Sequence, residues 1–179
     1  MGKATHPWRP VFDARSRVLI LGTIPSPQSR ARGFYYGHPQ NAFWPTLARV
    51  FGAQAPGVGA PAGEKAAFLL GLRVAVWDVI RECEIDGASD GSIKNPVVNL
   101  FRPLIDGSRI SAVFTNGWAA TRIFERHCRD EAGASPIYLP STSPANRAGQ
   151  SKPGYWERWS LVPAAVVGRR DGIASARQD

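Results

Sequence analysis

The chain has 179 residues, of which 44% are hydrophobic and 20% are charged. This length suits one domain with one core, and the composition is too apolar for a disordered chain. The 22 Lys and Arg outnumber the 14 Asp and Glu, which leaves a net charge of +8. Such a charge favours a polyanionic partner such as nucleic acid, although plain soluble proteins also carry it.

The two cysteines, Cys83 and Cys128, lie far apart and outside any CxxC or Cys/His ligand spacing. This argues against a zinc site and against an iron–sulfur cluster. No stretch has the roughly 18 apolar residues of a membrane span, and the N-terminus does not resemble a signal peptide. We therefore expect a cytoplasmic protein without a metal, a cofactor or a membrane contact, associated with the nucleoid if the source is bacterial.

Four short apolar runs rich in β-branched residues predict strands over residues 18–21, 74–77, 110–114 and 137–139. Helical patterns occupy residues 44–51, 64–72, 96–105, 119–128 and 155–161. Strands that alternate with helices predict an α/β fold, with a parallel sheet covered on both faces.

The expected domain covers residues 1–167. The stretch 51–63 is rich in Gly, Pro and Ala and is typical of a surface loop inside that domain. Residues 168–179 contain three arginines and few large apolar side chains, so we expect them to form a flexible tail.

Small, polar and proline-containing segments follow the predicted strands. Gly22 to Pro27 follows the first strand, Asp78 the second, Asn116 and Gly117 the third, and residues 140–146 the fourth. In open α/β sheets, ligands bind outside the carboxyl ends of the strands. The sequence therefore predicts a binding site at this edge.

The run FYYGHPQNAFW, residues 34–44, combines aromatic and amide side chains. Every nucleobase has a π-face that gains about 1–3 kcal/mol on an aromatic ring, so this run is suited to base binding. Alternatively, Phe43 and Trp44 begin an amphipathic helix and enter the core, which we expect for Trp44. Asn41 stands at the predicted helix start, where its amide either faces a ligand or caps the helix.

The segments LILGTIP (19–25), YYGHPQNAFW (35–44), WDV (77–79) and LPSTSPA (139–145) resemble, in this order, the motifs of the hypoxanthine-DNA glycosylase branch of the uracil-DNA glycosylase superfamily. The match runs from about residue 10 to about residue 160. The resemblance implies a three-layer α/β/α sandwich with a short central parallel sheet of about four strands. It also implies a base-excision enzyme that needs no metal or cofactor, and we expect it to act as a monomer on DNA.

The resemblance assigns catalytic roles to three residues. The superfamily's first motif carries an Asp or Asn just before its proline, where this chain has Ile24. In the hypoxanthine branch that role belongs to the amide that maps onto Asn41. The second motif often carries a His, where this chain has Ser141, followed by Thr142 and Ser143. We expect Asn41 to act on water, and Ser141 and Ser143 to donate hydrogen bonds to the departing base.

Base-binding candidates come from the segments that follow the predicted strands and from the aromatic run, residues 34–44. Asp78 could accept a hydrogen bond from an N–H of hypoxanthine, or could instead cap the following turn. The full set is Gly22, Thr23, Ile24, Pro25, Tyr35, Tyr36, His38, Phe43 and Asp78.

DNA-binding candidates lie in or beside the segments that follow the predicted strands. Residues 144–147 resemble the loop that pinches the DNA backbone and enters the gap left by the flipped nucleotide, or are simply a Ser/Pro-rich turn. The basic candidates would contact phosphates, although a solvated face would explain each of them. The full set is Ser26, Arg30, Arg32, Pro144, Ala145, Asn146, Arg147 and Lys152. For Asn116 and His127 we expect structural roles.

The sequence thus favours a monofunctional DNA glycosylase of base excision repair that hydrolytically removes a deaminated base, with hypoxanthine first and uracil second. A lyase activity is not expected, because the lysines, Lys3, Lys65, Lys94 and Lys152, all lie outside the motifs. A non-catalytic module that binds damaged DNA and a uracil- or mismatch-specific glycosylase are the alternatives. An esterase using Ser141 or Ser143 with His38 lacks the Gly-x-Ser-x-Gly elbow.

Overall fold

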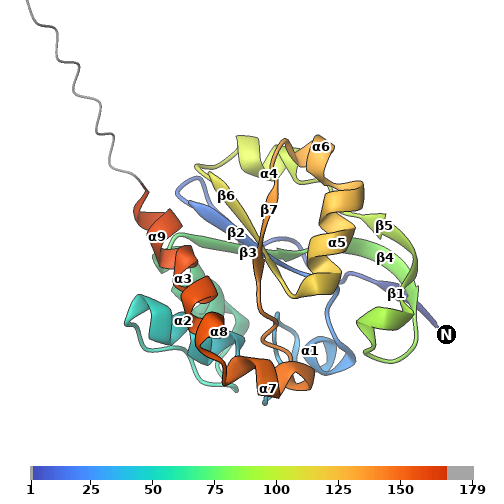
Figure 1. Cartoon of the computed structure of the whole chain (residues 1–179), viewed down its shortest axis with the longest axis horizontal. Coiled ribbons are helices and arrows are strands. Elements are labelled where there is room, and N and C mark those ends of the chain that lie inside the picture. Colours follow the sequence, from blue (N-terminus) through green and yellow to red (C-terminus); the bar gives the residue numbers. More distant parts are fainter. Residues whose placement is uncertain (1, 169–179) are drawn as a thin grey trace, which may run out of the picture.

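The computed structural model describes residues 2–168 and has a parallel sheet at its centre (Figure 1). Its strands lie in the order β3 (Val74–Asp78), β2 (Val18–Gly22), β6 (Ala112–Asn116) and β7 (Pro136–Leu139), and each is parallel to its neighbours. Every residue of β2 is buried, which explains why this strand is a continuous apolar run. The prediction of a central parallel sheet is confirmed, with the third strand beginning at Ala112 rather than at residue 110.

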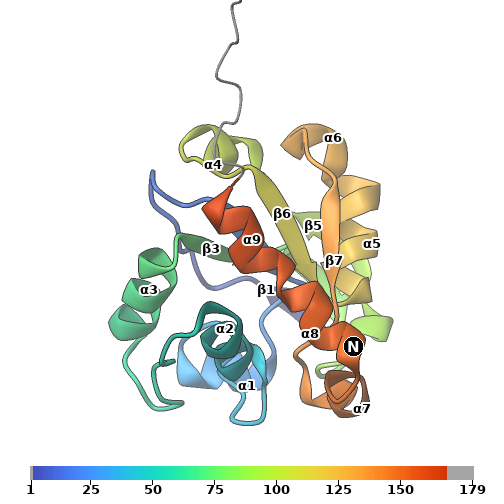
Figure 2. The same ribbon diagram turned by 60° about the vertical axis from the view of Figure 1, so that its left-hand side comes forward.

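Helices cover both faces of this sheet and complete the predicted three-layer α/β/α sandwich (Figure 2). Ile20 and Val76 point toward one helical layer, whereas Leu19 and Ala75 point toward the other, because side chains alternate along a strand. The first layer consists of α2 (Phe43–Phe51), α3 (Ala62–Gly71), α8 (Pro153–Trp159) and α9 (Leu161–Val167). The second layer consists of α4 (Arg102–Asp106), α5 (Trp118–His127) and α6 (Arg129–Ala132).

A second, antiparallel sheet was not predicted. It contains β1 (Gly2–Thr5), β4 (Ile80–Ile85) and β5 (Lys94–Val98), in the order β1-β4-β5. The predicted helix over residues 96–105 is therefore wrong in its first part, which is strand β5. Pro96 is tolerated there because β5 is an edge strand and no further neighbour requires the N–H that proline lacks.

The remaining differences concern short elements. Helix α9 follows α8 after Ser160 and was not predicted as a separate helix. Four short elements connect the others: α1 (Pro27–Arg32), η1 (Asp90–Ser92), η2 (Pro144–Asn146) and α7 (Arg147–Gln150). Within residues 2–168, no helix is long and apolar enough to cross a membrane. The predicted C-terminal tail lies outside the described residues from position 169 onward.

The carboxyl ends of the four parallel strands meet at one edge of the sheet, where α1 and α7 lie in Figure 1. Strand β3 ends there at Asp78 and continues after a single residue, Val79, into β4 of the second sheet. The backbone N–H groups of Val79 and Ile80 donate to the carbonyls of Gly22 and Thr23. The two sheets are thereby joined directly at the edge where the sequence predicts a site.

Candidate active site at the carboxyl edge of the sheet

A polar cavity of about 120 Å³ opens between the strand ends. All three predicted catalytic residues line it, together with most of the predicted base-binding residues. The predicted residues at its wall are Gly22, Thr23, Ile24, Pro25, Ser26, Arg30, Tyr35, Tyr36, Asn41, Asp78, Ser141 and Ser143. The tertiary structure therefore brings the four motif segments into contact with one space.

Asn41 lies at the wall of this cavity, directly before α2. Its Oδ1 accepts a hydrogen bond from the backbone N–H of Phe43 at 3.0 Å, although the N-cap residue of α2 is Ala42. That bond orients the carboxamide and occupies only one lone pair of Oδ1. The amide therefore stabilises the first turn of α2 and still has polar groups available to the cavity.

The loop after β7 is tied to the start of α2. The backbone carbonyl of Thr142 accepts from the N–H of Ala42 at 3.0 Å. The buried Thr142 also exchanges two hydrogen bonds with Asn116, whose Nδ2 donates to Oγ1 at 2.8 Å and whose Oδ1 accepts from the Thr142 N–H at 3.0 Å. These bonds agree with the structural role expected of Asn116. They hold the loop that contains Ser141 and Ser143, the serine loop, beside Asn41.

The hydroxyls of Ser141 and Ser143 are oriented by the backbone. The Ser141 Oγ accepts from the N–H of Ser143 at 3.1 Å, and the Ser143 Oγ accepts from the N–H of Ala145 at 3.3 Å. A hydroxyl that accepts from the backbone keeps its own proton for another partner. Each serine can therefore donate a hydrogen bond to a ligand in the cavity.

Phe43 requires a correction. Its side chain is fully buried and does not line the cavity, so it cannot contact a base there. The first turn of α2 directs it into the core, where it meets Trp159, and the ring of Tyr36 stacks on it at a centroid distance of 3.8 Å. Phe43 thus supports Tyr36. Trp44 is buried in the core, as expected.

His38 also lies away from this cavity. It lines a second, largely apolar cavity of about 210 Å³, and Tyr36 and Asn41 line both cavities. The Nδ1 of His38 accepts from the N–H of Gln40 at 3.0 Å, which stabilises the turn before α2. The second cavity also contains the buried Lys65, whose Nζ donates to the carbonyl of Val58 at 2.9 Å.

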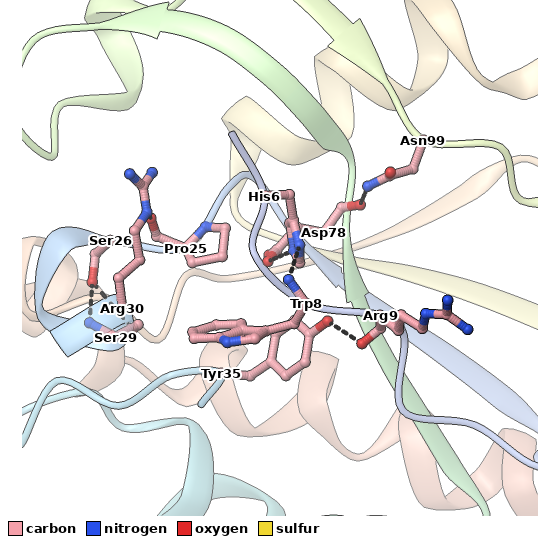
Figure 3. Close-up of polar contacts among 10 residues, drawn as sticks. All are labelled: His6, Trp8, Arg9, Pro25, Ser26, Ser29, Arg30, Tyr35, Asp78 and Asn99. Atoms are coloured by element: carbon pink, nitrogen blue, oxygen red, sulfur yellow. Dashed lines mark hydrogen bonds and ion pairs between the residues drawn. The ribbon is translucent and has the colours of Figure 1, made fainter. Parts of the chain in front are cut away.

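Asp78 is buried at the first cavity and is bonded to a histidine that sequence reasoning missed (Figure 3). The Nε2 of His6 lies 2.8 Å from Asp78 Oδ2, and the Nδ1 of His6 accepts from the N–H of Trp8 at 3.1 Å. The Nδ2 of Asn99 donates to the backbone carbonyl of Asp78 at 2.9 Å. Among the described residues, the carboxylate makes no hydrogen bond to the turn that follows it, which argues against the capping alternative.

Gly22 allows the close approach of two polar groups. A Cβ at this position would collide with Asp78 Oδ1 and would lie 3.2 Å from the hydroxyl of Tyr36. Both groups therefore lie against the same point of β2. The hydroxyl of Tyr36 is buried and has no hydrogen-bond partner among residues 2–168. Burial, and next the negative charge of Asp78, raise the pKa of Tyr36, a shift that the nearby amide of Asn116 opposes, and the hydroxyl keeps its proton.

Tyr35 and Asp90 are two further titratable residues at the cavity wall, and both have raised pKa values. The hydroxyl of Tyr35 donates to the carbonyl of Arg9 at 2.9 Å, and burial raises its pKa. Asp90, on η1 between β4 and β5, was not predicted at the site, yet it accepts a hydrogen bond from Thr23 Oγ1 at 3.2 Å. Burial raises the pKa of Asp90, a shift that the bond from Thr23 opposes.

The predicted DNA contacts lie in two groups. Arg30 and Ser26 line the cavity: the Nε of Arg30 donates to the carbonyl of Pro25 at 3.0 Å, and Ser26 caps α1 (Figure 3). The others do not line it, and among them Arg32, Ala145, Arg147 and Lys152 are exposed. Asn146 donates from Nδ2 to the carbonyl of Ser141 at 2.9 Å, so it shapes the serine loop. The DNA-binding roles of these residues stay predictions.

Within the described part of the chain, no group of three or more His, Cys, Asp or Glu side chains could hold a metal ion.

Comparisons with known proteins give the relatives of this chain. Hypoxanthine DNA glycosylases from Methanosarcina barkeri and Methanosarcina acetivorans are 29% and 30% identical to it, and each alignment covers 82% of this chain and 92% of the relative. A solution NMR structure of a candidate uracil DNA glycosylase from Methanosarcina acetivorans superposes with a TM-score of 0.76 at 28% identity, covering 91% of this chain and 98% of the other. The model of the uracil DNA glycosylase superfamily matches residues 9–163. With the motif segments gathered around one polar cavity, these matches show that the chain belongs to the uracil DNA glycosylase superfamily.

Proposed function

We propose that this protein is a monofunctional DNA glycosylase that hydrolytically removes a deaminated base. Hypoxanthine is the proposed preferred substrate, and uracil is the alternative. The observation that carries the proposal is the convergence of Asn41, the serine loop and Asp78 on one polar cavity at the strand ends. The two relatives named hypoxanthine DNA glycosylase support hypoxanthine as the substrate.

The proposed reaction begins with extrusion of the damaged nucleotide, because a base stacked in a duplex cannot be attacked in place. A weakly paired, deaminated base costs less to extrude than a normal one. The base then enters the cavity, where the ring of Tyr36, supported from below by Phe43, forms part of the wall.

In the chemical step, the oxygen of a water molecule bonds to C1′ of the sugar while the glycosidic bond breaks. The bonding electrons leave with the base, and the water proton is transferred to the base or to solvent. Asn41 positions the water through the free lone pair of Oδ1, because its other lone pair is bonded to Phe43. The hydroxyls of Ser141 and Ser143 donate to the base as negative charge develops on it.

DNA is held by basic groups around the cavity in this proposal. Arg30 stands at the wall itself, while Arg32, Arg147 and Lys152 are exposed and contact phosphates of the flanking nucleotides. The η2 segment follows Ser143 directly and enters the gap in the duplex. Binding of this kind weakens steeply as the salt concentration rises.

The test is a panel of oligonucleotides that carry hypoxanthine, uracil, xanthine or mismatched thymine opposite each normal base. We expect the fastest release from hypoxanthine, measured as strand cleavage after treatment with alkali. Without alkali the strand should stay intact, because the product is an abasic site. Cleavage that needs no alkali and disappears in Lys152→Ala would contradict the monofunctional assignment.

The alternative is a module that binds damaged DNA without turnover. The apolar Ile24 at the cavity wall favours it, because the superfamily's first motif carries an acid or an amide there. Tight binding to the panel without release of any base would support this alternative.

A further inference from the structure

The orientation of the His6 ring follows from its two hydrogen bonds. Nδ1 accepts from the backbone N–H of Trp8, so the ring proton resides on Nε2 and is donated to Asp78 Oδ2. Both side chains are buried, with 2% and 6% of their surfaces exposed. The bond is therefore shielded from solvent.

Several contacts immobilise this histidine. Its backbone N–H donates to the carbonyl of Arg81 at 2.7 Å, which extends the pairing of β1 with β4. Its ring contacts Trp8 and Tyr35, with centroids 6.0 and 5.8 Å away (Figure 3). It also contacts Trp77, at a centroid distance of 6.4 Å. The proton donor that faces Asp78 is thus held by backbone pairing and by packing.

The bond to His6 occupies Oδ2 of Asp78 and leaves Oδ1 for another partner. Oδ1 lies against Gly22 and accepts no hydrogen bond among the described residues. A free acceptor therefore stands at the wall of the cavity that Asp78 lines. This acceptor complements the ring N–H of a lactam edge, in which a ring N–H adjoins a carbonyl oxygen. Hypoxanthine, xanthine and uracil have that edge, whereas adenine and cytosine have a ring-nitrogen acceptor beside an amino donor.

We propose that His6 is a positioning residue that fixes Asp78, so that Asp78 Oδ1 faces the ring N–H at the lactam edge of the extruded base. The N–H of the base donates to Asp78 Oδ1. Adenine in the same orientation places its N1 lone pair against the carboxylate. Guanine and thymine share the lactam edge, so their exclusion depends on the cost of extruding them from stable pairs. The inference rests on the proposed function and identifies the chemical feature that its substrates share.

Two variants at position 6 isolate the hydrogen bond. His6→Phe keeps a ring of similar volume but cannot donate to Asp78. His6→Gln keeps an N–H donor at a reach similar to that of Nε2. His127→Phe, on the exposed surface of α5, is the matched control.

The readout is the ratio of single-turnover rates on DNA containing hypoxanthine and on DNA containing unsubstituted purine, which lacks the lactam edge. Intrinsic differences in reactivity between the two leaving groups are the same for every variant, so they cancel when the ratios of two variants are compared. We expect His6→Phe to lower the ratio by roughly ten-fold or more, as for the loss of a charge-assisted hydrogen bond. His6→Gln should retain most of the ratio, and His127→Phe all of it.

A purely structural role of His6 would slow both reactions equally and leave the ratio unchanged, which would overturn the inference. If His6→Phe has no cooperative melting transition, His6→Asn takes its place, because its amide oxygen can still accept from the N–H of Trp8 while the side chain is too short to reach Asp78. An unchanged ratio in His6→Asn would then overturn the inference.

A binding assay separates this inference from the proposed function. Duplexes with 2′-fluoro versions of the two nucleotides resist hydrolysis, so their relative affinities need no turnover. If the protein releases no base but loses its preference for the lactam base in His6→Phe, the proposed function fails and the inference stands. If the protein releases hypoxanthine and His6→Phe keeps the preference for the lactam base, the proposed function stands and the inference fails.

Discussion

The two cavities that share Tyr36 and Asn41 differ in size and in chemistry. The first, of about 120 Å³, is lined by polar groups from four strand ends, whereas the second, of about 210 Å³, lies among α2, α3 and the loop between them. The larger cavity is mainly apolar, and Lys65 is its buried charged group. The comparison indicates that converging polar groups mark the candidate active site better than volume does.

Hydrogen bonds orient the polar groups of the first cavity. The backbone orients Asn41, Ser141 and Ser143, and His6 orients Asp78. Catalytic groups held in this way need little rearrangement when charge develops in the transition state. Substitutions at the two cavities can show whether the chemistry resides in the first cavity alone.

The largest effect is expected for Asn41→Ala. The rate of base release should fall by about 10²–10⁴-fold, the range for a positioned catalytic group, while affinity for lesion DNA changes little. Single-turnover kinetics and a binding titration measure the two quantities. Val58→Ala, at the second cavity only, is the control and should retain the wild-type rate. A comparable loss in Val58→Ala would place the chemistry in the other cavity.

A smaller effect is expected for Gly22→Ala. The added methyl group collides with Asp78 Oδ1, so that Asp78 or β2 must shift. We expect a loss of about 1–3 kcal/mol in the free energy of unfolding, as for overpacking of a core, and slower release of hypoxanthine. Gly71→Ala is the matched control, because a Cβ there has nothing within 4 Å. Equal stabilities of the two variants in urea titrations would contradict the close approach at Gly22.

The smallest effect on activity is expected for Lys65→Met in the second cavity. Burial, and next the charge of Arg32, lower the pKa of Lys65 in the folded protein. Between that lowered pKa and the ordinary value of about 10.5, the unfolded chain binds more protons, so the wild-type protein gains stability as the pH rises. Lys65→Met should lack this rise and should be at least as stable at pH 7, since an apolar group replaces a buried amine.

Melting temperatures measured across this pH range test the Lys65 prediction, and base release should equal that of the wild type. A large loss of activity would show that the second cavity takes part in the reaction.

The extent of correct prediction differs between the two sheets. The buried parallel strand β2 is an unbroken apolar run that is visible without any structure. Strand β4 mixes apolar with charged residues, and its pairing with β5 shifts register on both sides of Glu82. Its alternation is therefore irregular, and Pro96 in β5 favours a helix start over a strand. The second sheet, and with it the position of Asp90, escaped prediction for this reason.

The amino-acid pattern alone was enough for the strands of the central sheet and the polar segments at their ends, whereas the resemblance of residues 35–44 to a known family supplied the candidate role of Asn41. These features depend on neighbouring residues and on the general rule that parallel strands share one functional edge. The pairing of His6 with Asp78, 72 positions apart, and the bond from Ala42 to Thr142 arise only when the chain is folded. Local patterns carry no information on which distant segments meet, and so the two cavities and the contact of Phe43 with Trp159 emerged from the packing of the whole chain.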